Sequence, residues 1–246
     1  GTQTRGLHYD LFYSPDGIEW TPYKGNPVIN TGNELGRWAG RFQGWDPIRE
    51  TYYVTMEASH HWRGPYGKRL VGKAESPDMI HWSYPEIMLV PDQDDFPDTE
   101  FYSLPVLPYN GIYVGMLWIF RTTNVIHYPE VIFSRNGFHY QRNYREPFIP
   151  RGGAFGDFDS SSVYVQDTIV HGDRIFTYYT GTNSRSPEIA LELGDKATTG
   201  IGLAISRLDG FVSLDSWKGW VQTDASEDEL QKTTGERVLF KQPESY

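Results

Sequence analysis

The chain has 246 residues, of which 38% are hydrophobic and 15% aromatic, enough to build a sizeable buried core. About one residue in six is Gly or Pro, which is typical of a turn-rich globular protein and excludes a disordered tail. The 22 Lys and Arg residues against 32 Asp and Glu residues give a net charge of −10, so neither nucleic acid nor an anionic membrane is an expected partner.

Several kinds of chemistry are missing from the sequence. The chain has no Cys, which excludes thiol nucleophiles, disulfides and Cys-ligated zinc. It has no nucleophile elbow and no Walker or Rossmann glycine pattern, so no cofactor is expected. The adjacent pair His60-His61 has no third residue spaced to complete a metal site, so no metal is predicted.

In chain order, the first predicted strand covers 7–13 and leads into the turn Ser14-Pro15-Asp16-Gly17-Ile18-Glu19-Trp20. Similar turns start at Ser76, Ser134 and, in weaker form, Ser206, so the starts lie 62, 58 and 72 residues apart. A second landmark, a hairpin turn between two strand-like runs, recurs near 45–47, 109–111 and 171–173. A period of this length indicates a repeat architecture.

Each repeat predicts four antiparallel strands, which is the blade of a β-propeller. The fuller blades are expected at about 38–90, 100–150 and 160–214. Only 188–196 has a composition that suits a helix, so the predicted fold class is all-β.

The blade count is about three and a half, below the four blades of the smallest closed propeller. We therefore expect 1–215 to be an incomplete propeller with more than one blade upstream, because an open propeller leaves apolar faces and strand edges uncovered. The tail 216–246 breaks the blade pattern and could start a second β-domain.

A resemblance to a known group rests on several of these motifs together. They are the turns at 14–20 and 76–82, the Gly-Trp-Asp-Pro hairpin at 44–47, the segment 101–109 and the ending Leu-Asp-Gly-Phe-Val-Ser-Leu at 208–214. In this order and spacing they resemble the five-bladed β-propeller proteins related to glycoside hydrolase families 32 and 43, in particular a little-characterised branch in which a β-sandwich follows the propeller. The resemblance implies a secreted or periplasmic enzyme acting on an oligo- or polysaccharide.

Glycoside hydrolysis needs two carboxyl groups facing one sugar. Glu100 opens the predicted inner strand 101–107 and resembles the general acid of the related families, although their Glu-Cys-Pro pattern is absent. Asp98 is a nearby substitute for Glu100. Asp159 opens the inner strand of the last blade and is the possible partner, with Asp157 as its rival. Asp46 is interpreted as a turn residue, because Asp-Pro is common in turns and no Arg-Asp-Pro motif occurs.

Sugar sites combine carboxylates with aromatic rings and hydroxyl-binding Arg, His or Asn side chains. Such residues recur after the second strands of successive blades and at the starts of inner strands. The predicted substrate-binding residues are Trp38, Arg41, Glu57, His60, His61, Tyr102, Trp118, Arg121 and Asn183, with Trp62, Asn124 and Arg185 as neighbours.

The predicted function is a glycoside hydrolase that uses paired carboxylates in the central funnel of the propeller. The alternative is a carbohydrate-binding propeller module that binds glycans without cutting them. What separates the two is whether two carboxylates converge within about 10 Å, the upper end of the separations used in glycoside hydrolysis. A third, weaker possibility is a scaffold that binds protein on its rim.

Overall fold

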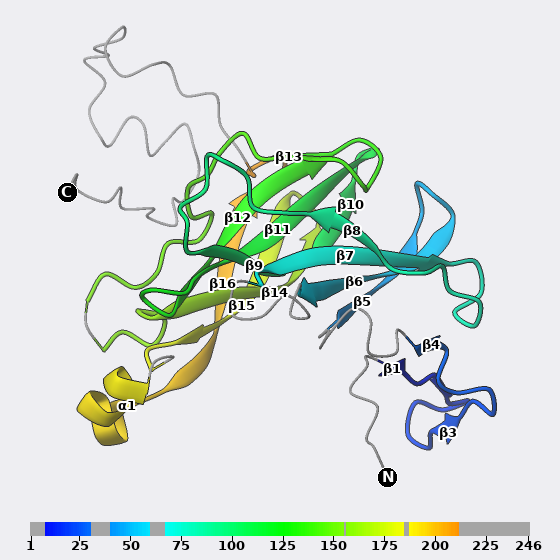
Figure 1. Ribbon diagram of the computed structural model, residues 1–246, viewed down its shortest axis with the longest axis horizontal. Helices are drawn as coiled ribbons and strands as arrows, with labels where there is room; N and C mark the ends of the chain where they lie inside the picture. The colour runs from blue at the N-terminus through cyan, green and yellow to red at the C-terminus, as the bar shows by residue number, and fades with distance from the viewer. Residues whose placement is uncertain (1–7, 31–39, 60–66, 155, 185–186, 212–246) are drawn as a thin grey trace, which may run out of the picture. The chain divides into compact units, whose positions relative to one another are not determined.

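The computed structural model describes residues 8–30, 40–59, 67–154, 156–184 and 187–211, and these residues form a nearly all-β fold (Figure 1). The chain divides into two compact units, Gly1–Pro147 and Phe148–Tyr246. No helix in the described part of the chain has both the length and the apolar character needed to span a bilayer.

The first unit begins with two small sheets. Strand β1 (His8–Tyr9) pairs with β4 (Ile29–Asn30), and β2 (Phe12–Tyr13) pairs with β3 (Thr21–Pro22). The prediction of one continuous strand over 7–13 is wrong. The Leu11 amide donates to Asn26 Oδ1 at 2.8 Å and the Leu11 carbonyl accepts from Asn26 Nδ2 at 2.9 Å, so a side chain takes the backbone groups that a continuous ladder would use.

A four-stranded antiparallel sheet follows, in the order β5 (Gly40–Asp46), β6 (Thr51–Ser59), β7 (Arg69–Ser76) and β8 (Glu86–Leu89). Val54, Met56 and Leu70 pack with Ile29 of β4 in one hydrophobic cluster. This sheet therefore has the strand order that the sequence repeat predicts for one blade.

The next sheet of the first unit repeats this pattern. Strands β9 (Thr99–Ser103) and β10 (Val106–Tyr109) both pair with β11 (Ile112–Arg121), which pairs with β12 (Ile126–Ser134), and β12 pairs with β13 (Tyr140–Gln141). Pro105 lies between β9 and β10, where its missing N–H interrupts the ladder. Val71 and Leu89 of the preceding sheet form a buried cluster with Phe101, Leu117 and Ile119.

The second unit contains the antiparallel ladder β14 (Ser162–His171), β15 (Arg174–Thr182) and β16 (Thr199–Arg207). Helix α1 (Pro187–Leu193) and the 3₁₀ turn η2 (Gly194–Lys196) lie between β15 and β16 in the chain. The expectation that helix composition is confined to 188–196 is confirmed for the described residues.

The repeated turn has one physical cause in its first three copies. In the second copy, Asp78 Oδ1 accepts hydrogen bonds from the amides of Ile80 and His81, at 2.9 and 2.8 Å. Asn136 takes the same role in the third copy and Asp16 in the first. A side chain that replaces backbone acceptors fixes the reversal between two strands.

Two sheets thus match the predicted four-stranded unit, and the third ladder has three strands among the described residues. The ladders traced by the described residues are open rather than closed on themselves. The tail 216–246 lies outside the described residues. The limits of the propeller, 1–215, and its blade number stay predictions.

Candidate functional site

Two of the predicted site residues meet at one arginine in the first unit. Glu57 lies near the end of β6, Arg69 begins β7, and Glu100 is the second residue of β9. Arg69 Nε lies 3.3 Å from Glu57 Oε1, and Arg69 Nη1 donates to Glu100 Oε2 at 2.5 Å. With the roughly 2.3 Å between two nitrogens of one planar guanidinium, these contacts place the two carboxylate oxygens within about 8 Å of each other. We call Glu57 and Glu100 the acid pair.

The register of the hairpin explains the first of these contacts. Glu57 pairs across the ladder with Val71, and Ser59 pairs with Arg69. Glu57 and Arg69 are therefore diagonal neighbours on one face of the β6–β7 hairpin, within reach for long side chains. Glu100 is the second residue of β9 and lies opposite Phe120 of β11, at the start of this strand.

The two carboxyl groups have different electrostatic surroundings. Burial raises the pKa of Glu57 to about 7, and the charge of Glu100 adds to this effect while Arg69 opposes it. Arg69 makes the shorter contact with Glu100 and the longer one with Glu57, so burial dominates at Glu57. Burial disfavours the Arg69 cation, but the hydrogen bond to Glu100 and the charges of both carboxylates outweigh it and raise the Arg69 pKa.

Aromatic rings lie beside the acid pair. The Arg69 guanidinium carbon is 5.5 Å from the ring centroid of Tyr102 and 5.4 Å from that of Phe120. The Tyr102 ring stacks on Trp118 at 6.3 Å and 10°, and Arg41 lies 5.8 Å from the Trp118 ring centroid. Four predicted residues, Arg41, Glu57, Tyr102 and Trp118, therefore belong to one group with Glu100.

Three members of this group, Arg69, Phe120 and His127, are not among the residues predicted from the sequence. Arg69 joins the acid pair, and Phe120 lies under its guanidinium. His127 is fully buried, stacks on Phe120 at 4.3 Å and 5°, and meets the edge of Tyr102 at 5.1 Å. Arg69 could have been predicted, because it is a polar residue at the start of the strand that follows Glu57. Nothing in the sequence distinguishes Phe120 and His127 as site residues, since aromatic and histidine residues also occur in ordinary cores.

Arg121, a predicted substrate-binding residue, makes contacts within the protein. Its Nη2 lies 2.7 Å from Asp98 Oδ1, its Nε donates to the same oxygen at 2.8 Å, and its guanidinium carbon is 4.1 Å from the ring centroid of Phe96. Asp98, considered as a substitute for Glu100, is thus the ion-pair partner of Arg121. The effect of these contacts is to hold the loop before β9.

Two candidates lie in the second unit. Asp159 precedes β14 by three residues, is buried, and accepts a hydrogen bond from the Tyr179 hydroxyl at 3.1 Å. Burial, followed by the charge of Asp159, raises the Tyr179 pKa to about 12. Asn183 is buried, and its amide group donates to the carbonyls of Gly156 and Lys196. The Asn183 amide group therefore holds two loops together, and its predicted contact with a sugar stays a prediction.

Two acids considered in the sequence analysis are turn residues. Asp157 Oδ2 accepts a hydrogen bond from the Ala154 amide at 2.9 Å. Asp46 is fully buried and accepts hydrogen bonds from the amides of Ile48 and Arg49 and from the Tyr113 hydroxyl. The interpretation of Asp46 as a structural turn residue is confirmed by these contacts. Asn124 lies in the exposed turn after β11.

Some predicted residues lie outside the described residues: Trp38, His60, His61, Trp62 and Arg185. Among the residues that the structure does describe, no group of three or more His, Asp or Glu side chains is placed to hold a metal ion.

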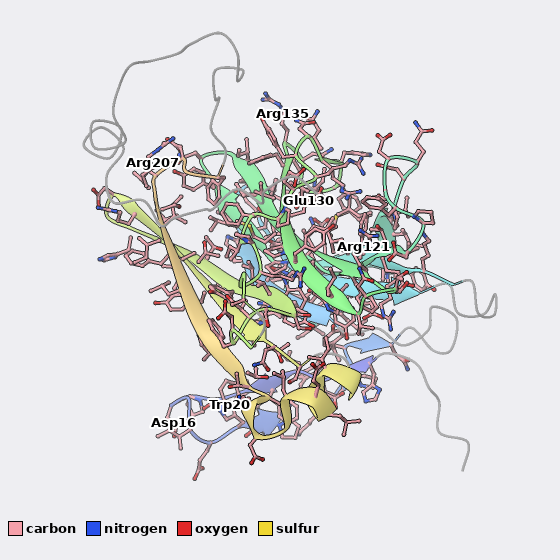
Figure 2. All side chains as sticks on the ribbon, turned by 90° about the vertical axis from the view of Figure 1, so that its left-hand side faces the viewer. Asp16, Trp20, Arg121, Glu130, Arg135 and Arg207 are labelled. Carbon is pink, nitrogen blue, oxygen red and sulfur yellow. The ribbon has the colours of Figure 1, made fainter. Side chains whose placement is uncertain are left out.

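A surface pocket of about 300 Å³ opens elsewhere on the first unit. Ile112 at the start of β11 and Ser134 at the end of β12 line it, together with Arg135 and His139. The acid pair lies toward the other ends of these strands, near Phe120 and His127, and Figure 2 shows Arg121 and Arg135 well apart. Asn136, also in its lining, uses its side chain to build the turn, so the pocket is a product of turn geometry.

No family model matches the chain, and no curated protein matches it in sequence. Solved structures match it in three dimensions. A protein described as a glycoside hydrolase has a TM-score of 0.56 and 16% identity, over 76% of this chain and 52% of its own. A family 117 glycoside hydrolase of Zobellia galactanivorans has a TM-score of 0.53 and 15% identity, over 68% and 51%.

A third match is the β-1,2-mannobiose phosphorylase of Listeria innocua, with a TM-score of 0.57 and 12% identity over 84% of this chain and 52% of that one. The chain thus spans about half the length of each of these structures. At this level of identity the comparisons establish the fold alone. The described chain has the β-rich fold of glycoside hydrolases and related carbohydrate-active enzymes.

Proposed function

We propose that this chain is part of a carbohydrate-active enzyme of the five-bladed propeller type, which cleaves glycosidic bonds in an oligo- or polysaccharide outside the cytoplasm. The observation that carries the proposal is the acid pair. A carboxyl group with a pKa of about 7, Glu57, shares one arginine with a second carboxylate, Glu100, beside stacked aromatic rings. The fold shared with glycoside hydrolases supports the same class of function.

In the proposed mechanism Glu57 is the general acid. With a pKa of about 7 it holds a proton at neutral and lower pH and can give that proton to the oxygen of the leaving sugar as the glycosidic bond breaks. Glu100, hydrogen-bonded to Arg69, faces the positive charge that develops on the sugar ring. The oxygen of a water molecule forms the new bond to the ring carbon that loses the leaving sugar, and the proton released by that water replaces the one that Glu57 gave. The half-buried rings of Tyr102 and Trp118 offer a flat surface for the C–H face of a sugar.

This assignment revises the roles predicted from sequence, where Glu100 was the acid and Asp159 its partner. Glu57 is preferred as the acid because its pKa is raised by burial and by the neighbouring carboxylate, the two effects that keep a carboxyl group protonated. The catalytic role of Asp159, which lies in the second unit, stays a prediction.

The test measures sugar release from β-fructans, arabinans, xylans, galactans and β-1,2-mannobiose, the last with and without inorganic phosphate. Wild type is compared with Glu57→Gln, Glu100→Gln and the control Glu86→Gln, whose glutamate is exposed on β8. Both acid-pair variants should lose at least about 100-fold in rate on the natural linkage, within the range for general acid–base groups. Only Glu57→Gln should keep most of its rate on a dinitrophenyl glycoside, since that leaving group needs no proton.

Two results would count against the proposal. If both acid-pair variants cut as fast as Glu86→Gln, the acid pair is not the catalytic site. If wild type binds a glycan of the panel and cuts none, the chain is a carbohydrate-binding module, the alternative that the sequence left open. Release that depends on phosphate would identify phosphorolysis in place of hydrolysis.

A further inference from the structure

A loop next to the acid pair carries an exposed aromatic ring. Phe96 lies in the segment between β8 and β9, and 63% of its surface is exposed. A large apolar side chain in this position forgoes the stabilisation that burial would give it. It therefore calls for an explanation when the loop that holds it is rigid.

Arginines fix this loop. Arg142 donates two hydrogen bonds to Asp95, at 2.6 and 2.8 Å, and Arg145 donates to Asp92 at 2.7 Å. Within the loop, the Thr99 amide donates to the Phe96 carbonyl at 2.9 Å. A segment ordered in this way pays little further conformational entropy when a ligand binds to it.

One side of the Phe96 ring is also occupied. The Arg121 guanidinium lies 4.1 Å from the ring centroid and is held by Asp98. Asp98 further accepts hydrogen bonds from the backbone amides of Thr122 and Thr123, which ties the β11–β12 turn to the loop. The ring is thus backed by a cation on one side while most of its surface faces solvent.

The turn beside the ring is strained and polar. Val125 has φ of 53°, a left-handed conformation that is costly for a β-branched residue and that recurs where a loop is held in one shape for function. Thr122, Thr123 and Asn124 are exposed in this turn, and the Thr122 hydroxyl donates to the Asp98 carbonyl at 3.3 Å. An exposed ring flanked by hydroxyl and amide groups suits a sugar ring, which has a C–H face and a polar rim.

This group lies at the same end of the β9–β11 ladder as the acid pair. Thr99 pairs with Arg121 and the next pair is Glu100 with Phe120, so the two groups come from adjacent positions on opposite faces of the ladder. We propose that Phe96, backed by Arg121 and flanked by the β11–β12 turn, is a second sugar-binding platform that holds a unit of the glycan chain away from the bond that is cut. This inference rests on the proposed function and narrows its substrate class to chains of several sugar units.

The test compares Phe96→Ala and Phe96→Trp with wild type. The matched control is Trp20→Ala, since Trp20 is 60% exposed on the first Ser-Pro-Asp-Gly turn. Dissociation constants for the soluble polysaccharides of the panel are measured by affinity electrophoresis, and cleavage of a single-unit aryl glycoside is measured in parallel. Phe96→Ala should bind its polysaccharide about five- to tenfold more weakly, as expected for one lost ring contact, while Phe96→Trp and Trp20→Ala bind like wild type. Cleavage of the aryl glycoside should stay within about twofold of wild type, because that substrate does not reach the platform.

Three outcomes would overturn the platform. They are unchanged polysaccharide binding by Phe96→Ala, an equal loss on the aryl glycoside that indicates a structural role, and no binding of any polysaccharide by wild type. Because binding is read without cleavage, the platform and the catalytic proposal can fail separately. Loss of activity in the acid-pair variants with normal binding by Phe96→Ala removes the platform alone.

Discussion

Two clusters in the first unit place an arginine between two carboxylates, and they differ in how completely the charges are matched. Arg142 donates two hydrogen bonds to Asp95 and two to Glu130, and only 6% of its side chain is exposed. Arg69 makes one close contact with each member of the acid pair, and 38% of its side chain is exposed. The Arg142 side chain is therefore buried, whereas the Arg69 side chain is partly exposed to solvent.

Both clusters contain a carboxyl group whose pKa is raised by burial. In the Arg142 cluster, charge-assisted hydrogen bonds lower the pKa of Asp95 despite burial, whereas at Glu130 burial outweighs its bonds to Arg142 and raises the pKa. At the acid pair, Glu57 has the longer contact with its arginine, and burial raises its pKa to about 7. A carboxyl pKa near neutrality is typical of a site that exchanges protons.

The largest predicted effect is the loss of stability when Arg142 is replaced. Arg142→Ala should lower the free energy of unfolding by about 3 to 5 kcal/mol, because Glu130 would stay buried without a counter-charge. Asp95 would keep only its contact with Arg145, whose Nη1 lies 3.1 Å from Asp95 Oδ1. Denaturant unfolding of the full chain measures the change, and Arg135→Ala, on the exposed turn after β12, is the control. A loss below about 1 kcal/mol, the range of exposed pairs, would show that the two clusters are energetically alike.

The next effect is a pH dependence of stability. The Glu57 pKa is raised from 4.5 to about 7 in the folded chain, so the folded state binds this proton more tightly than the unfolded state. Stability from the bound proton is complete below about pH 4.5 and is lost as the pH rises through about 7. The free energy of unfolding of wild type, relative to that of Glu57→Gln, should therefore fall by on the order of 3 kcal/mol as the pH rises across this window. A difference in the free energy of unfolding between the two proteins that stays the same at every pH would contradict this prediction.

The smallest effect concerns Arg69, which joins the acid pair. Arg69→Met should cost about 1 kcal/mol of stability, because the pair is partly exposed and screened by solvent. It should also raise the Glu57 pKa further, since the cation that opposes the shift is gone. Unfolding curves and a carboxyl titration measure the two changes. A fall in the Glu57 pKa in this variant would contradict the statement that the Arg69 cation lowers that pKa.

The sequence predicted the features that depend on short-range bonds. The turns at Asp16, Asp78 and Asn136 close over two or three residues, so their repeat was visible in the sequence and placed the strands of two sheets. The prediction of a strand over 7–13 is wrong because the side-chain amide that interrupts it belongs to Asn26, which lies 15 residues from Leu11 in the sequence.

The site was predictable in part for the same reason. Glu57, Glu100 and Tyr102 were selected as residue types that suit sugar chemistry at strand ends. Arg69 reaches Glu100 across 31 residues, and this pairing depends on how two sheets pack. The pKa of Glu57 follows from burial and from that same packing, which no local pattern encodes.

The most direct test of the account is a ¹³C NMR titration of the Glu57 carboxyl group, assigned by its loss in Glu57→Gln. The account predicts an apparent midpoint near pH 7 in wild type and a lower one in Glu100→Gln, where the neighbouring negative charge is removed. A midpoint at the ordinary value of 4.5 in both proteins would contradict it, since Glu57 would then hold no proton to give at neutral pH.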